Sequence, residues 1–343
     1  MQLRRESAHI CEEFDTGPGK WDVEKRALAP VFGRYVTRNS TFVTYLSGVR
    51  DQIEAYVSRT SVKRPLNILL AAAPGSGKSF LIKQLISTIN SDLDIAFEEV
   101  YIASLENSSE LYSVFQRVQS INLEGKLPAI FFDEVDSAIN GTKLYPKFLA
   151  PMWDGTFYIG KERFVLGKSI FFFAGSTLSL EDGSNKILED ANTLTISYDE
   201  YFDRWKSLFD DHVKSDQDKL LDFVDRVDAI IRIPPVRKEL LGDQCKSEYE
   251  DLVCMLVDKH FPKVKFIGKA ALEIICNELT KGSSLRVAEK IVFNSKPVDP
   301  EIFDRGCLPR RYKAVDQKET SFVEIVRHPK GELHDANKSA EKS

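Results

Sequence analysis

The feature that most constrains this 343-residue chain is a glycine-rich loop between a predicted strand and a predicted helix. The loop, residues 72–79, reads Ala-Ala-Pro-Gly-Ser-Gly-Lys-Ser and follows the apolar run 66–71. After the loop, apolar residues recur at helical spacing on one face, namely Leu81, Ile82, Leu85, Ile86 and Ile89. A loop in this context can cradle phosphate groups, so the sequence predicts a nucleoside triphosphate site, with ATP as the expected ligand.

Each residue type in the loop suits contact with phosphate. Gly75 and Gly77 allow backbone conformations that turn successive N–H groups toward phosphate oxygens. Lys78 supplies a mobile positive charge for the β and γ phosphates, and Ser79 is the expected Mg²⁺ ligand. The loop departs from the usual pattern at its first position, where Ala72 replaces glycine. The predicted nucleotide-binding residues in the loop are Pro74, Gly75, Ser76, Gly77, Lys78, Ser79 and Phe80.

A second apolar run, residues 129–132, ends in the carboxylates Asp133 and Glu134. In an open parallel sheet, ligands lie beyond the carboxyl ends of the strands. We therefore expect Asp133 to face the phosphate loop and to hold Mg²⁺ together with Ser79. Glu134 is the candidate catalytic base, which would orient and polarise a water molecule for attack on the γ-phosphate. This pair of carboxylates favours hydrolysis over transfer to a hydroxyl acceptor.

Short apolar runs alternate with helix-like segments through the middle of the chain. The expected strands are residues 66–71, 97–103, 129–132, 170–174 and 229–233, and the expected helices are 42–57, 79–90 and 109–120. Asp154-Gly155 predicts a hairpin or loop before the fourth strand. Only amphipathic helical segments follow Pro234-Pro235. The predicted fold class is α/β, a three-layer sandwich around a central parallel five-stranded sheet, followed by a small all-α lid domain.

The expected domain organisation follows the same pattern. Residues 1–41 are predicted to be an irregular N-terminal extension, 42–237 the α/β domain, 238–300 the helical lid and 301–343 a polar, disordered tail.

Composition limits the class of protein. Hydrophobic residues make up 43% of the chain, enough for a substantial core, and the net charge is −5. Nucleic acid is therefore not indicated as a partner, although a local basic groove stays open. The five cysteines are dispersed without a Cys-x-x-Cys pair, as in a reducing compartment. Because no long apolar segment is evident, we expect a cytoplasmic protein without a signal peptide or membrane span.

The phosphate loop, the strand end Phe131-Phe132-Asp133-Glu134 and the helical segments after Pro235 resemble the AAA+ family of ATPases, over about residues 42–294. The resemblance implies a Mg²⁺-dependent ATPase that acts as a homo-oligomer. It also implies that ATP binding and hydrolysis remodel or regulate a macromolecular partner, expected to be a protein. Clp-type unfoldases carry an aromatic-glycine pore loop where this chain has Leu105-Glu106-Asn107-Ser108-Ser109, so the resemblance does not extend to polypeptide threading.

The resemblance points to three further site residues. In such ATPases a polar residue after the fourth strand, called sensor 1, contacts the γ-phosphate or the attacking water; Thr177 fits best and Ser176 next. An arginine near the fifth strand reaches the γ-phosphate of the neighbouring subunit, and Arg226 is the candidate, with Arg232 as the fallback. Arg286 matches sensor 2, an arginine that folds the lid onto the nucleotide.

Each of these assignments has a plainer alternative. The hydroxyl of Thr177 could cap a turn, Arg226 could form a salt bridge with a nearby aspartate, and Arg286 could be a solvated surface residue. Two other functions also stay open. A nucleotide-gated interaction module would bind ATP with little turnover, and a P-loop kinase would share the phosphate loop but insert its lid within the sheet domain.

Overall fold

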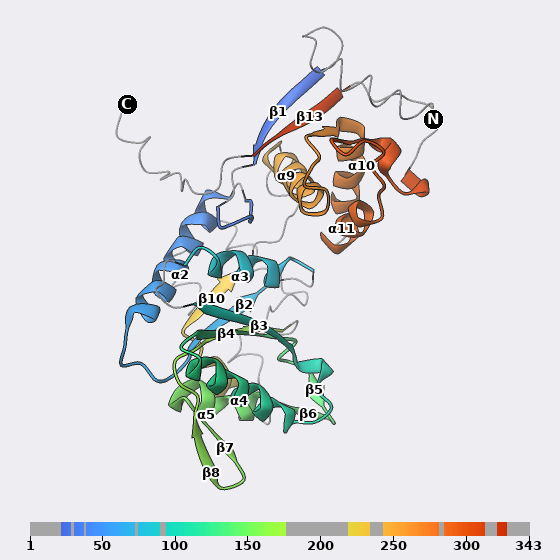
Figure 1. The fold of residues 1–343 in the computed structure, drawn as a ribbon. Helices are drawn as coiled ribbons and strands as arrows, with labels where there is room; N and C mark the ends of the chain where they lie inside the picture. Colours follow the sequence, from blue (N-terminus) through green and yellow to red (C-terminus); the bar gives the residue numbers. More distant parts are fainter. Residues whose placement is uncertain are drawn as a thin grey trace, which may run out of the picture. The chain divides into compact units, whose positions relative to one another are not determined.

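The computed structural model describes residues 22–28, 31–37, 39–72, 75–89, 94–175, 219–233, 243–280, 285–312 and 321–327. The chain divides into two compact units (Figure 1). The sheet unit comprises residues 39–235, and the helix-rich unit comprises residues 1–38 and 236–343. Among the described residues, no helix has the length and apolar content that crossing a membrane requires.

A parallel five-stranded sheet forms the centre of the sheet unit, in the order β10-β2-β9-β4-β3. Its strands are β2 (Leu66–Ala71), β3 (Ile95–Tyr101), β4 (Leu127–Asp133), β9 (Ile170–Ala174) and β10 (Ala229–Arg232). All four neighbouring pairs run parallel. Every residue of β2 and β9 is buried, as expected for strands covered on both faces. The predicted parallel five-stranded sheet is therefore confirmed.

Helices cover both faces of this sheet. Figure 1 shows α2 (Ser40–Ser58) and α3 (Lys78–Ile86) on one face, with α4 (Glu110–Leu123) and α5 (Tyr145–Asp154) on the other. Alternate strand residues point to opposite faces, and one face packs into a single apolar core with α4, α5 and the short helix α8 (Leu220–Val224). The three-layer arrangement follows from this double coverage.

Phenylalanine rings fill much of that core. Phe132 on β4 and Phe173 on β9 stack with ring centroids 5.4 Å apart, and Phe148 on α5 meets both edge-on at 5.0 and 5.3 Å. All three side chains are fully buried. Such aromatic pairs add about 0.5–1.5 kcal/mol each beyond the area they bury. They tie together the ends of β4 and β9, where the acidic motif lies.

Two small hairpins flank α5 between β4 and β9. The first pairs β5 (Ala138–Ile139) with β6 (Thr142–Lys143), and the second pairs β7 (Thr156–Ile159) with β8 (Glu162–Val165). The second is the hairpin expected before the fourth strand. Gly155 does not form its turn, however, because it caps the C-terminus of α5 in a left-handed conformation with φ of 62°.

The helix-rich unit combines helices with a small sheet. Its described helices are α9 (Asp243–His260), α10 (Lys269–Thr280) and α11 (Leu285–Phe293), in agreement with the amphipathic pattern. The sheet has the order β1-β13-β11-β12, with β1 at Asp22–Leu28, β13 at Ser321–Arg327, β11 at Phe266–Gly268 and β12 at Ile302–Phe303.

This small sheet corrects two expectations about the ends of the chain. Residues 22–28 and 321–327, expected to be irregular and disordered, pair as parallel strands. Residues 22–28 are largely charged and carry little local signal, whereas the Phe, Val and Ile residues of 321–327 suit a strand. They become strands because each supplies the hydrogen-bonding partner of the other. Arg26 on β1 also binds Asp251 of α9 at 2.9 Å, and both side chains are buried, which fastens the first strand to the helices.

Candidate functional site

The phosphate loop bends sharply between β2 and α3. Gly75 and Gly77 have φ of 77° and 83°, the left-handed region that glycine enters without strain. Gly77 is the N-cap of α3, so the helix begins at Lys78 and its first N–H groups emerge next to the loop. Pro74 lies outside the described residues. The described part of the loop therefore has the backbone geometry of an anion cradle at a helix N-terminus.

The side chains of the loop also suit an anion. The Lys78 Nζ donates a hydrogen bond to the Ala72 carbonyl oxygen at 3.3 Å, so the lysine folds across its own loop. Within the described part of the chain, the buried Ser76 Oγ has no hydrogen-bond partner. Buried hydroxyls usually have one. Ser79 follows Lys78 in the first turn of α3, and Phe80 comes next. A cation, an unsatisfied hydroxyl and a helix N-terminus together fit a phosphate group.

The acidic motif ends at the same edge of the sheet. Phe132 of β4 is level with Phe173 of β9, which is level with Leu69 of β2. Neighbouring strands lie about 4.8 Å apart, so the ends of β2 and β4 are separated by about 10 Å. A Mg²⁺ ion together with a phosphate group could span such a gap. Asp133, half-buried at the end of β4, accepts a hydrogen bond from the Glu134 N–H at 3.0 Å.

Glu134 occupies a strained backbone position. Its φ is 54°, which costs a residue with a Cβ roughly 1–2 kcal/mol. The following residues hold it there, because the Val135 N–H donates to the Ala174 carbonyl at 2.9 Å and the Ser137 N–H donates to the Glu134 carbonyl at 2.8 Å. The side chain of Glu134 is exposed. Strain that persists because the surroundings fix it is typical of residues with a function.

Asp136 lies beside the acidic motif, and the sequence alone predicts no role for it. Its side chain is buried and packs against Gly175, where an added Cβ would lie 2.7 Å from the carboxylate. Its backbone carbonyl accepts a hydrogen bond from Lys143 of the β5–β6 hairpin. Asp136 thus fixes the acidic turn against the end of β9. The candidate sensor residues Ser176 and Thr177 follow directly but lie outside the described residues.

Arg226 lies at the opposite edge of the sheet. Its carbonyl accepts a hydrogen bond from the Asn67 Nδ2 at 3.0 Å, and the Asp228 N–H donates to the Asn67 carbonyl at 2.8 Å. Asn67 is the second residue of β2, whereas the phosphate loop follows its last residue. At about 3.3 Å per residue, Arg226 is more than about 13 Å from that loop along the strand direction. The backbone of Arg226 therefore lies away from the phosphate loop of its own chain.

The carboxylates of Asp222 and Asp228, two of the candidates for a salt bridge with Arg226, each bind another basic residue. Asp228 binds Arg64 at 2.7 Å, and Asp222 binds Lys219 at 3.2 Å. The guanidinium of Arg226 donates instead to the backbone carbonyl of Asp222.

The two remaining arginine candidates occupy other places. Arg232 pairs with Ala71 at the end of β10 and so lies at the phosphate-loop edge of its own subunit, which makes it a poorer candidate for action in trans. Arg286 is the second residue of α11 in the helix-rich unit, and its side chain is exposed.

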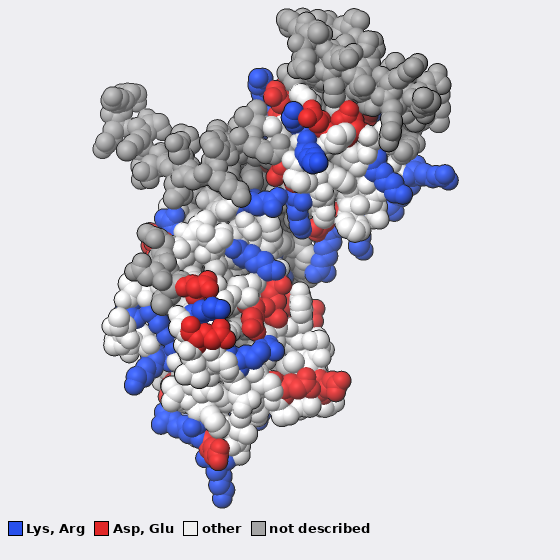
Figure 2. All heavy atoms as spheres, viewed as in Figure 1, with Lys and Arg blue, Asp and Glu red and all other residues white. Residues whose placement is uncertain are grey.

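Charge on the described surface is mixed. On the face shown in Figure 2, acidic and basic side chains alternate over the sheet unit and form no continuous basic stripe. This view agrees with the net charge of −5.

Comparison with known proteins supports one family. Residues 68–148 match the family model described as "ATPase family associated with various cellular activities (AAA)". No curated protein matches the chain. Similar solved structures include NtrX from Brucella abortus in complex with ADP, at 14% identity and a TM-score of 0.43, covering 81% of this chain and 55% of that one. The closed state of Hsp104 with ATPγS and FITC casein has 14% identity and a TM-score of 0.47, covering 74% and 44%.

The chain therefore spans about half the length of these solved structures. The segment that matches the family model contains both the phosphate loop and the Asp133-Glu134 strand end, and it extends into α5. Family match, motifs and parallel sheet agree, and residues 68–148 of the sheet unit form part of a P-loop ATPase domain of the AAA type.

Proposed function

We propose that this chain is a Mg²⁺-dependent ATPase whose active site is completed by a second copy of the chain, and that it uses hydrolysis to remodel or regulate a protein partner in the cytoplasm. One observation carries the proposal. The phosphate loop and the Asp133-Glu134 turn end at one edge of the sheet, with β9 between them. Binding groups for phosphate and a carboxylate suited to water activation thus lie beside each other.

Each residue at this edge of the sheet has its own proposed role. The N–H groups of the loop and Lys78 would bind the phosphates, and Ser79 and Asp133 would hold Mg²⁺ between them. The ion would neutralise charge on the phosphate oxygens. Glu134, exposed at the end of a rigid strand, would orient the water and take its proton. Thr177 is proposed to contact the γ-phosphate or that water, and Arg286 is proposed as a further nucleotide-binding residue.

The position of Arg226 supports an assembly. A guanidinium can neutralise charge on the transferred phosphoryl group through two parallel hydrogen bonds. Because Arg226 lies at the amino edge of its own sheet, it could supply this charge only to a neighbouring copy. The kinase alternative is less well supported, since helices α9 to α11 follow the sheet unit in the chain and do not interrupt it.

The test is hydrolysis by mixed subunits. Glu134→Gln should bind ATP and lose turnover, and Arg226→Ala should do the same. An equimolar mixture should regain activity, because some interfaces then combine an intact Glu134 with an intact Arg226 from the next copy. Specific activity of the parent protein should also rise with protein concentration. A flat, near-zero rate despite tight ATP binding would instead favour a nucleotide-gated switch.

A further inference from the structure

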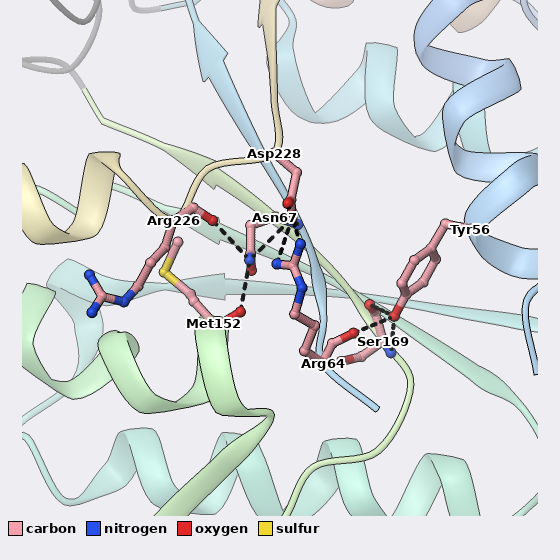
Figure 3. A network of polar contacts seen from close by, with 7 residues as sticks. All are labelled: Tyr56, Arg64, Asn67, Met152, Ser169, Arg226 and Asp228. Carbon is pink, nitrogen blue, oxygen red and sulfur yellow. Dashed lines mark hydrogen bonds and ion pairs between the residues drawn. The ribbon is translucent and has the colours of Figure 1, made fainter. Parts of the chain in front are cut away.

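A polar residue interrupts the apolar strand that leads into the phosphate loop. Asn67 is fully buried on β2, yet its Nδ2 donates to the Met152 carbonyl at 3.1 Å and to the Arg226 carbonyl at 3.0 Å (Figure 3). Burying an amide is unfavourable unless its groups are hydrogen-bonded. Here the Nδ2 is bonded, whereas the buried Oδ1 has no partner among the described residues. The amide therefore joins three elements, β2, the end of α5 and the segment before β10.

Asp228 holds the same segment from its other side. Its Oδ2 accepts a hydrogen bond from the Asn67 backbone N–H at 2.9 Å, and its two carboxylate oxygens bind both terminal nitrogens of Arg64 at 2.7 and 3.2 Å. Val227 between the two anchored residues is buried. The backbone is thus fixed at residues 226 and 228.

Arg64 is itself held in place. Its carbonyl accepts a hydrogen bond from the Tyr56 hydroxyl at 2.9 Å, and that hydroxyl also exchanges hydrogen bonds with the backbone of Ser169 at 2.8 and 3.0 Å. Burial raises the pKa of Tyr56, so its hydroxyl keeps its proton at neutral pH. The Arg64 guanidinium lies 5.6 Å above the ring of Trp153. Contacts from α2, from Ser169 just before β9 and from α5 therefore fix the residue that binds Asp228.

We propose that Arg64, Asp228 and Asn67 are positioning residues for Arg226, setting the place from which its guanidinium reaches the nucleotide of a neighbouring copy. This inference rests on the proposed composite site. In Figure 3 the Arg226 guanidinium points away from the network, so the network fixes only the backbone from which that side chain extends.

The Arg64–Asp228 ion pair should contribute little to the stability of the fold. The Arg64 side chain is 39% exposed, and ion pairs at such sites contribute little to stability. Removing it should therefore leave the fold and nucleotide binding nearly unchanged. Removing Arg64 should instead reduce the hydrolysis that depends on Arg226, the residue that the network orients.

The test is Arg64→Met in the subunit-mixing assay. We expect ATP affinity within about twofold of the parent protein and hydrolysis reduced about tenfold or more. A mixture with Glu134→Gln should restore activity, because those subunits supply a well-placed Arg226. A mixture with Arg226→Ala should not, since neither partner then provides one. Arg64→Lys should retain part of the activity, because lysine keeps the charge without the paired hydrogen bonds.

Two further variants sharpen the result. Arg117→Met removes an exposed arginine of the same unit whose Nε lies 3.1 Å from Glu98, and it should hydrolyse ATP like the parent protein. If Arg64→Met folds poorly, Asp228→Asn is the substitute, since it keeps an acceptor for the Asn67 N–H and removes the charge opposite Arg64.

Three results would count against the inference. Full activity of Arg64→Met alone would overturn it. A second contrary result is that Glu134→Gln subunits restore the activity of Arg226→Ala but not that of Arg64→Met. The composite site would then stand, but the defect of Arg64→Met would be a general one and not a misplaced Arg226. If Arg226→Ala is not restored either, the proposed function itself fails, and the positioning role fails with it.

Discussion

Replacing Gly155 by alanine should destabilise the sheet unit far more than the same replacement at Gly160. Both glycines have φ of 62° and lie at either end of β7. A Cβ at Gly160 would meet no atom within 4 Å. At Gly155 it would lie well inside 3.0 Å of the Lys63 carbonyl oxygen and 3.0 Å from the Arg64 Cα. The pair therefore separates backbone strain from the close approach of residues 63 and 64.

The expected magnitudes follow from these two contributions. An alanine in the left-handed region costs about 1–2 kcal/mol, and the reduced entropy of the unfolded chain offsets about 0.4–1 kcal/mol of this. Gly160→Ala should thus lower the free energy of unfolding by about 1 kcal/mol. At Gly155 the backbone of residues 63 and 64 must also move, and forced shifts of this kind cost about 1–3 kcal/mol more. Gly155→Ala should therefore lower the free energy of unfolding by about 2–4 kcal/mol.

Urea denaturation followed by tryptophan fluorescence would measure the difference. Trp153 lies two residues before Gly155 and beneath the Arg64 guanidinium, so its emission reports on this part of the sheet unit. The chain has three tryptophans, and replacing Trp21 and Trp205 by phenylalanine leaves Trp153 as the only reporter. The urea concentration at the unfolding midpoint should fall much further for Gly155→Ala than for Gly160→Ala. The dependence of the unfolding free energy on urea concentration should stay the same.

Equal midpoint shifts for the two alanine variants would refute the reasoning, because the close approach would then add nothing to the strain. The shift of residues 63 and 64 that Gly155→Ala requires should also affect function. Because Arg64 anchors Asp228, Gly155→Ala at a temperature where it is folded should lower hydrolysis more than ATP affinity, whereas Gly160→Ala should change neither.

Three other perturbations test separate parts of the chain. Lys78→Ala should weaken ATP binding measured by equilibrium dialysis, and a change within about threefold, or ~0.7 kcal/mol, would contradict the phosphate contact. Arg26→Met removes the cation bound to the buried Asp251 and should lower the thermal stability of the helix-rich unit, by about 3–5 kcal/mol, in circular dichroism. Burial raises the pKa of Glu289, but Lys259 at 2.5 Å outweighs this and leaves the pKa below its ordinary value of 4.5. Its stabilisation should therefore be complete above about pH 4.5 and disappear as the pH falls through the lowered pKa, and Glu289→Gln should abolish this pH dependence of unfolding.

The central sheet was predictable because its signals are local. The runs at β2 and β9 lie within single stretches of buried residues, and their predicted limits agree with the structure. The sharp turn of the loop after β2 could be predicted because two glycines mark it, and both adopt positive φ in the structure. Each of these features depends on residues close together in sequence, so pattern alone locates them.

Features that depend on distant partners could not be predicted in this way. The strands β1 and β13 come from opposite ends of the chain, and their pairing brings together segments about 300 residues apart in the sequence. Asp136 belongs to the same acidic run as Glu134, but its contact with Gly175 arises only when β4 and β9 lie side by side.

The two edges of the sheet differ in how a mutation should act on them. At the carboxyl edge the binding groups come from the loop and from Asp133 at the end of β4, so changes to these groups should affect ATP affinity and turnover together, whereas a change at Glu134 should affect turnover alone. At the amino edge, Asn67 links Arg226 to a network that contains no phosphate-binding group. If the site is shared between copies, changes at this edge should leave affinity intact and reduce only turnover, and only at the site of the neighbouring copy that receives the arginine. A protein whose hydrolysis requires both edges would be active only when assembled, which links turnover to assembly with its neighbours.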